Sequence, residues 1–253
     1  MSPDTNFEVD IMPEVEPGQT LLVGLATPGM AGVTAVEHLV RHCESEEIGH
    51  VTPDALPAIT PVEDGYPRHH TRLYNLLDHD LTVLVGELFV PVWAARSFTE
   101  TLLTWVERHA IEELALLHAV PYPHGPEDHK VFTIATDEYR SRRLTDSKAQ
   151  PLRGGFLDGV AGELASRSLA ADAPPVGIYV TPAHPPGPDV DAALLFLDVV
   201  ENVYNLEVDL TELEDLSEQI KEYYTTLAEQ LGALQRSEEE LRNREFTEDR
   251  MFM

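Results

Sequence analysis

The chain ends in Met251-Phe252-Met253, which places large apolar side chains and a free carboxylate at the end of a charged segment, 242–253. A charged segment offers no apolar environment that could bury these side chains. Their presence therefore indicates a binding pocket on a partner protein. There the apolar side chains would fill slots, while a lysine or backbone amides could capture the terminal carboxylate. Alternatively, Phe252 folds back onto its own chain, or the end is disordered. The tail alone leaves both interpretations open.

A second candidate chemistry is anion binding. The segment 27–32 contains Gly29 and Gly32 and connects a predicted strand to a predicted helix, whose N-terminal amides could hold a phosphate. Arg68 and Arg72 form a small basic region in an acidic chain and could neutralise an anion. The segment lacks the Walker lysine and the G-x-G-x-x-G spacing. Tight packing therefore explains its glycines better, and salt bridges explain the arginines better.

Metal binding and catalysis are supported less well. His124, Asp128 and His129 lie in one proline-containing loop, but the histidines are not spaced as in a helical zinc motif and no glutamate base accompanies them. We therefore expect a surface loop, with no metal site and no cofactor. The sequence also lacks a G-x-S-x-G nucleophile motif, so no catalytic residue is predicted.

Alternating strand and helix patterns would position these residues. Apolar runs at 20–25, 80–86, 113–120 and 176–180 predict buried strands, and the amphipathic stretches between them predict helices. This alternation is typical of an α/β fold with a mostly parallel central sheet. Residues 137–150 are polar and predict a loop.

The chain divides by pattern into four expected segments. These are an acidic N-terminal segment (1–17), an α/β core domain (18–208), a long C-terminal helix (209–241) and a charged tail with an apolar tip (242–253). The helix carries apolar residues at heptad-like spacing, which suits either pairing with a second copy or packing on its own domain. The predicted oligomerisation residues are Leu213, Leu216, Ile220, Tyr223, Leu227 and Leu234.

Composition restricts the partners and the setting. Of the 253 residues, 43% are hydrophobic, which is enough for a core, and the net charge is −28. This charge argues against nucleic acid or an anionic membrane as a partner and is typical of a halophilic interior, where salt screens acidic repulsion. No apolar stretch approaches the roughly 20 residues of a membrane span, and the lone Cys43 fits a reducing compartment. We expect a cytoplasmic protein.

Loose motifs follow one another between residues 18 and 235. They occupy residues 22–32, 47–57, 63–65, 80–87, 155–162, 188–193 and 206–210. In this order they resemble the proteasome assembly chaperone 2 family, in an archaeal form. The resemblance implies a three-layer, phosphorylase-like α/β sandwich and a homo-oligomer.

The resemblance also implies a function. It points to a non-enzymatic proteasome assembly chaperone or adaptor. The tail, with Phe252 where the docking motif of such proteins usually has tyrosine, would enter pockets between proteasome core-particle α-subunits. The alternative is a nucleotide- or phosphate-binding enzyme that uses the same fold and holds its ligand near Gly29, Gly32, Arg68 and Arg72.

Overall fold

The computed structural model describes residues 5–12, 15–125, 128–145, 147, 149–170, 173–184, 187–227 and 230. The chain divides into two compact units, which meet between Asp209 and Leu210. The elements of the first unit are β1 (Phe7–Ile11), β2 (Thr20–Leu25), α1 (Ala31–His42), β3 (Ser45–Pro53), β4 (Val62–Glu63), β5 (Tyr66–Pro67), β6 (Thr71–Leu76), β7 (Leu81–Gly86), α2 (Val92–Arg108), β8 (Glu113–Val120), β9 (Phe132–Ala135), α3 (Asp137–Arg143), β10 (Gln150–Pro151), α4 (Gly159–Arg167), β11 (Val176–Pro182) and α5 (Val190–Tyr204).

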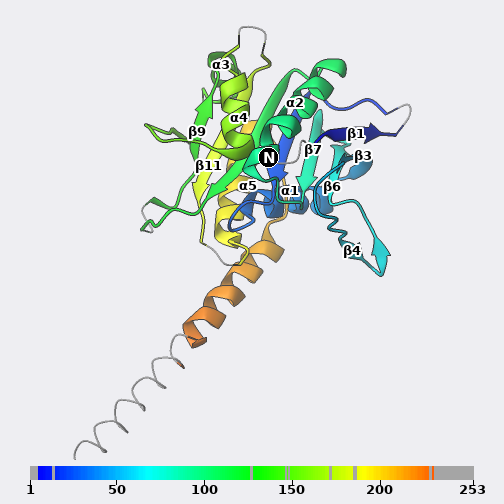
Figure 1. Ribbon diagram of the computed structural model, residues 1–253. Coiled ribbons are helices and arrows are strands. Elements are labelled where there is room, and N and C mark those ends of the chain that lie inside the picture. The colour runs from blue at the N-terminus through cyan, green and yellow to red at the C-terminus, as the bar shows by residue number, and fades with distance from the viewer. Residues whose placement is uncertain are drawn as a thin grey trace, which may run out of the picture. The chain divides into compact units, whose positions relative to one another are not determined.

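A nine-stranded sheet forms the centre of the first unit, in the order β1-β3-β6-β7-β2-β8-β11-β9-β10 (Figure 1). The four central strands β7, β2, β8 and β11 are parallel to one another. Antiparallel pairs flank them, β6 with β7 on one side and β9 with β11 on the other. All residues of β2, β7 and β11 are buried, which explains their continuous apolar sequence. The predicted α/β fold with a parallel central sheet is confirmed.

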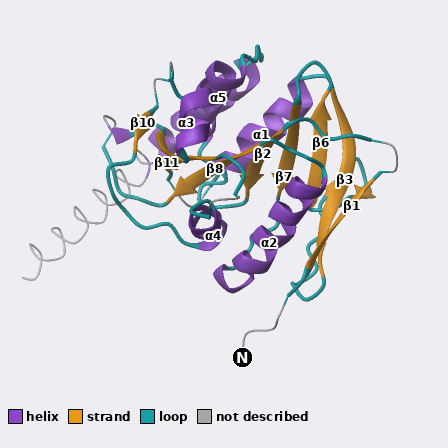
Figure 2. Ribbon diagram, turned by 90° about the horizontal axis from the view of Figure 1, so that it is seen from above, coloured by secondary structure: helices purple, strands orange, loops and turns teal. Residues whose placement is uncertain are grey.

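Helices cover both faces of the sheet. In Figure 2, α2 and α4 lie on one side of the strands, and α1 and α5 lie on the other. The helices of each pair also contact each other. This is the predicted three-layer sandwich. It follows from right-handed crossover connections between parallel strands, which place helices on the faces of the sheet.

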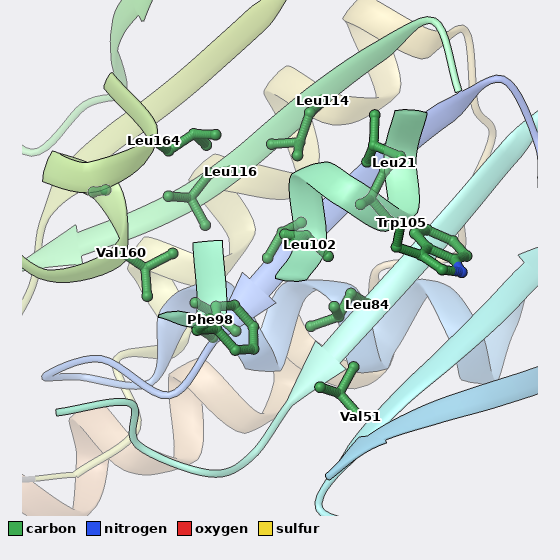
Figure 3. Close-up of a cluster of buried hydrophobic side chains, with 14 of the residues drawn as sticks. Leu21, Val51, Leu84, Phe98, Leu102, Trp105, Leu114, Leu116, Val160 and Leu164 are labelled. Atoms are coloured by element: carbon green, nitrogen blue, oxygen red, sulfur yellow. The ribbon is translucent and has the colours of Figure 1, made fainter. Parts of the chain in front are cut away.

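A cluster of buried apolar residues fills the space between the sheet and the α2–α4 layer (Figure 3). From α2, Phe98, Leu102 and Trp105 point toward Leu21 of β2 and Leu84 of β7. The three helix residues follow three- and four-residue spacing, so they share one face of α2. Burying each of these side chains contributes about 1.5–3 kcal/mol.

On the opposite face, glycines allow α1 to approach the sheet closely. A Cβ atom on Gly32 would lie 2.5 Å from the carbonyl oxygen of Leu117, and one on Gly24 would lie 2.4 Å from the carbonyl oxygen of Gly32. Such distances are too short for any side chain. These glycines therefore set how near α1 lies to β2 and β8.

The second unit contains a helix at residues 211–227, which lies within the segment 209–241 where the sequence predicts a helix. In its first turn the Glu214 amide donates to the Leu210 carbonyl at 3.0 Å. The predicted extension to residue 241 and the charged tail at 242–253 lie outside the described residues. Within the part of the chain that the structure describes, no helix combines the length and the apolarity of a membrane span.

Two elements differ from the sequence prediction. Residues 137–143 form α3, with Thr136 as its N-cap, inside the stretch predicted as a loop. Tyr139 is the only residue that α3 buries, so the helix has no apolar periodicity. In the acidic N-terminal segment, residues 7–11 form β1, which pairs with β3 and alternates inward and outward side chains.

Candidate functional site

The loops with the richest chemistry gather where the strands β7, β2, β8 and β11 end, an edge of the sheet that we call the carboxyl edge. In folds of this kind, ligand sites lie at the carboxyl ends of parallel strands. The connections that leave this edge are the β2–α1 turn, the β7–α2 loop, the β8–β9 loop and the β11–α5 loop. They carry Gly29, His124, Asp128 and His129 of the residues that the sequence analysis considers.

The β2–α1 turn contains Gly29, and Gly32 follows in the first turn of α1. Gly29 has a φ of 78°, which glycine adopts without strain. A Cβ atom there would lie 2.7 Å from the Ala183 side chain, and the Gly29 carbonyl accepts a hydrogen bond from the Asp189 amide at 2.7 Å. Because Gly32 packs on β8 as described above, close packing accounts for both glycines.

The two arginines of the predicted anion site are paired with carboxylates. Arg68 binds both Glu87 oxygens, at 2.7 and 3.1 Å, and its Nε lies 3.2 Å from a Glu63 oxygen. Arg72, with a side chain that is 7% exposed, contacts Glu87 at 3.1 Å. The Arg72 guanidinium also donates to the Tyr74 hydroxyl. Salt bridges, rather than a free anion, therefore neutralise this basic region.

The histidine beside these arginines adds little positive charge. Burial lowers the pKa of His70, and neighbouring His69 lowers it further. Desolvation raises the pKa of Tyr74 to about 12, so this phenol stays neutral across the physiological range. The group is best described as a buried polar network.

A cavity of about 240 Å³ lies at the carboxyl edge. It is lined by the ends of β2 and β8, the β7–α2 loop and the start of α4. His118 and Asp158 are its titratable lining residues, and burial lowers the pKa of His118. The described lining residues include no lysine or arginine, so the cavity offers no permanent cation to a phosphate. Its walls are otherwise mainly apolar.

Large apolar side chains are exposed around the same edge. Phe89 and Val92, which line the cavity, are 57% and 62% exposed. Met30 in the β2–α1 turn, Tyr122 after β8 and Phe156 before α4 are exposed as well. Several exposed apolar side chains gathered at one edge are typical of a protein-binding surface.

The β8–β9 loop differs from the plain surface loop that the sequence predicts. His124 and His129 lie beside His184 from the β11–α5 loop, with ring centroids 4.5–5.4 Å apart. Burial lowers the pKa of His129, which favours its neutral form. Asp128 is exposed and is not part of this cluster.

The residues predicted to act in oligomerisation lie in the second unit. Leu216, Tyr223 and Leu227 are exposed, Ile220 is half-buried and Leu213 is buried. Leu234, the last heptad position, lies outside the described residues. The predicted docking residues also lie outside them; these are Met251, Phe252 and Met253.

Known structures share this fold over most of the chain. Pyrococcus furiosus PbaA, described as an archaeal homolog of proteasome-assembly chaperone, is 20% identical with a TM-score of 0.75 over 99% of this chain and 100% of PbaA. Pyrococcus furiosus PbaB, an archaeal proteasome activator, is 19% identical with a TM-score of 0.70, over 89% and 99% of the two chains.

A protein of unknown function from Thermoplasma acidophilum is 23% identical, with a TM-score of 0.70 over 86% of this chain and 91% of that one. No curated protein gives a significant match to the sequence. A sequence model of the PAC2 family matches residues 21–228. This match covers the sheet from β2 onward and the helix at 211–227, and the chain therefore belongs to the PAC2 family.

Proposed function

We propose that this protein is a proteasome assembly chaperone or adaptor that acts by binding and not by catalysis. The observation that carries the proposal is the PAC2 family match, together with a fold shared along the full length of PbaA. PbaA is described as a homolog of proteasome-assembly chaperone and PbaB as a proteasome activator. The corresponding partners of this chain are proteasome core-particle α-subunits.

The carboxyl edge supports a binding role over the enzymatic alternative. A phosphate or nucleotide site needs cations or free amides, whereas Arg68 and Arg72 are occupied by Glu87 and the glycine turn is filled by packing. The exposed apolar side chains around the edge suit contact with another protein. A thermal-shift screen with phosphate and nucleotides should give no stabilisation; a reproducible increase in Tm would favour the enzyme.

The tail supplies the docking mechanism in this proposal. Met251 and Phe252 would each contribute about 1.5–3 kcal/mol from apolar burial, before the cost of ordering the tail. The carboxylate of Met253 would add a charge-assisted hydrogen bond to a lysine. In concentrated salt the charged contact is screened, so the apolar side chains carry more of the affinity.

A homo-oligomer would make such short tails effective. If several copies assemble through the heptad residues of the C-terminal helix, one particle presents several tails at once. Tethering then raises the avidity by on the order of 10²–10⁴ through effective concentration. We further propose a cytoplasmic location in a halophilic cell, on the basis of the net charge of −28.

Reconstitution tests the chaperone role directly. Proteasome α- and β-subunits are mixed with and without the full chain in molar KCl, and native electrophoresis follows the formation of core particles. We expect a complex of the chain with α-subunits and a faster or higher yield of core particles. Peptide hydrolysis by finished core particles, measured in parallel, separates assembly from activation. If the chain changes neither yield nor hydrolysis and forms no complex, the proposed function is wrong.

A further inference from the structure

Three histidines from two loops meet at the carboxyl edge. His124 and His129 lie between β8 and β9, and His184 follows β11. The parallel strands β8 and β11 are paired up to Val120 and Pro182, so both loops leave the sheet side by side. One ring nitrogen of each histidine lies within 4.8 Å of the corresponding nitrogens of the other two.

Hydrogen bonds orient two of these rings. The Nδ1 atom of His124 lies 2.7 Å from the Tyr122 carbonyl oxygen, and the Nδ1 atom of His184 lies 2.8 Å from a carboxylate oxygen of Asp189. Both partners are acceptors, so the neutral ring carries its hydrogen on Nδ1. The lone pair is then on Nε2, which is free to coordinate an ion. Metal-binding histidines are commonly oriented in this way by a carbonyl or a carboxylate.

Two of the three Nε2 atoms make no hydrogen bond to any described residue. Nε2 of His124 and Nε2 of His129 are both buried and lack a hydrogen-bond partner among the described residues. Buried polar atoms are rarely left in this state unless a ligand or an ion completes them. Among the described residues, the stacked pair His50 and His69, with ring centroids 3.5 Å apart, belongs to no group of three close ligand atoms and has no orphaned buried ring nitrogen. Close approach of two histidine rings therefore does not by itself indicate a metal site.

Asp189 holds the third histidine in place. Its side chain is 6% exposed, and one carboxylate oxygen accepts both from Nδ1 and from the backbone amide of His184, the latter at 2.7 Å. The other oxygen accepts from the Ala192 amide at 3.0 Å and caps α5. The Asp189 amide donates to Gly29, which ties the same residue to the β2–α1 turn. The carboxylate is thus fixed by the fold.

We propose that His124, His129 and His184 form a binding site for a divalent transition-metal ion, best suited to zinc. Three imidazoles are a common zinc ligand set, and they leave a fourth position for water or for a carboxylate of a partner. Nitrogen ligands at about 2.0–2.1 Å in a tetrahedron lie about 3.3 Å apart, so binding draws the three rings together from their present spacing. Imidazole ligands do not suit magnesium or calcium, which prefer oxygen.

The site would clamp two loops of the carboxyl edge. An ion held by both loops binds the folded chain and not the unfolded one, so it stabilises the fold by an amount that grows with the logarithm of its concentration relative to Kd, and Tm rises accordingly. Through Asp189, the same ion would stiffen the start of α5 and the glycine turn beside the exposed apolar side chains. This role does not depend on the proteasome proposal.

Zinc titration of the untagged full chain tests the site. The protein is stripped with a chelator and dialysed, then titrated with zinc chloride by calorimetry, and bound zinc is measured by elemental analysis. We expect one ion per chain and a rise in Tm on binding. His184→Gln should weaken binding more than tenfold. Asp189→Asn, which keeps a good helix cap, should weaken it by about 10–100-fold.

His79→Gln is the matched control, because His79 lies in the turn between β6 and β7, at the opposite edge of the sheet. It should bind zinc like the wild type. Circular dichroism verifies that each variant is folded, and His124→Gln replaces His184→Gln if the latter does not fold. Zinc binding that is absent in the wild type, or equal in all histidine variants, would overturn the proposal.

Discussion

Glu87 is the residue on which the basic region depends. Its carboxylate accepts from Arg68 and from Arg72, both of which are largely buried. Two positive charges therefore share this carboxylate, and Arg68 also lies 3.2 Å from Glu63. Removing the Glu87 charge leaves the buried Arg72 guanidinium without its carboxylate, which costs more than the net value of the interaction itself.

We predict that Glu87→Gln lowers the free energy of unfolding by about 1–3 kcal/mol. Urea denaturation followed by circular dichroism measures the effect. Glu112→Gln is the control, because Glu112 pairs with Arg142 at 3.4 Å on the exposed surface, where an ion pair contributes about 0–1 kcal/mol. Equal effects of the two substitutions would mean that the arginines find other partners.

The sequence could predict the role of an individual residue only where nearby positions in the chain determine that role. The glycines at 29 and 32 and the pairing of Arg68 and Arg72 followed from local pattern and from the acidic composition. The three-histidine cluster did not, because His184 is far from His129 in sequence. Only the parallel pairing of β8 with β11 brings their loops together. No local spacing could have indicated that contact.

At the scale of elements, buried tyrosines join α3, β11 and α5. The hydroxyl of Tyr139 lies 3.0 Å from that of Tyr179 and 2.6 Å from that of Tyr204. A Cβ atom on Gly177 would lie 2.2 Å from the Tyr139 ring, so the glycine makes room for it. This packing gives α3 its place and explains why a polar segment is helical.

Alkaline pH should weaken this junction. Burial raises the pKa of Tyr139 and of Tyr179 above the unfolded value of about 10. Their contribution to stability is complete below pH 10 and is lost as pH rises through the folded pKa, since only the unfolded chain releases its protons. We predict that the free energy of unfolding falls above pH 10 by about 1.4 kcal/mol per pH unit for each tyrosine.

Urea denaturation between pH 9 and pH 11.5 measures this slope. Tyr179→Phe removes one of the titrating groups and should make the decline shallower by about 1.4 kcal/mol per unit. The variant loses a hydrogen bond, so only the slope is compared and not the absolute stability. A wild-type slope that matches that of the variant would contradict the assignment.

The helix at 211–227 exposes apolar residues that a second copy of the chain could cover. Leu216, Tyr223 and Leu227 are exposed large apolar residues, and a second copy of the helix would bury them. We predict that Leu216→Asp combined with Leu227→Asp converts an oligomer to a monomer, as measured by light scattering after size exclusion in high salt. Gln219→Asp with Thr226→Asp is the control and should leave the mass unchanged. A wild type that is already monomeric would exclude the pairing.

Elements with strong apolar patterns were predictable from the sequence, and those held by tertiary contacts were not. The buried strands β2, β7, β8 and β11 appear as continuous apolar runs, and the amphipathic α2 has a clear apolar face. In contrast, α3 buries one residue, and β1 is short and at the sheet edge. Both depend on contacts that lie elsewhere in the chain.

At the scale of the whole molecule, the net charge of −28 dominates the behaviour in solution. Self-repulsion destabilises the compact state and is screened over roughly 10 Å at 0.1 M salt but roughly 3 Å at 1 M. We predict that Tm rises steadily between 0.1 and about 2 M KCl, with each kcal/mol gained adding about 2–4 °C. Differential scanning calorimetry measures this dependence.

A variant with fewer charges provides the control for the salt effect. Glu44→Gln, Glu46→Gln and Glu107→Gln remove exposed carboxylates and should reduce the dependence of Tm on salt. A Tm that is constant or falls with added KCl would contradict the halophilic interpretation of the composition.

We propose above that the proteasome α-ring is the partner and that residues 251–253 are the contact. Surface plasmon resonance with immobilised core particles in molar KCl measures it, comparing the full chain with a chain that lacks residues 251–253. Phe246→Ala is the control for Phe252→Ala, because it removes the same side chain elsewhere in the tail. We predict that the full chain and Phe246→Ala bind, and that the truncation and Phe252→Ala weaken binding at least tenfold. Equal binding by all four would contradict the tail mechanism, and no binding by the full chain would contradict the proposed function itself.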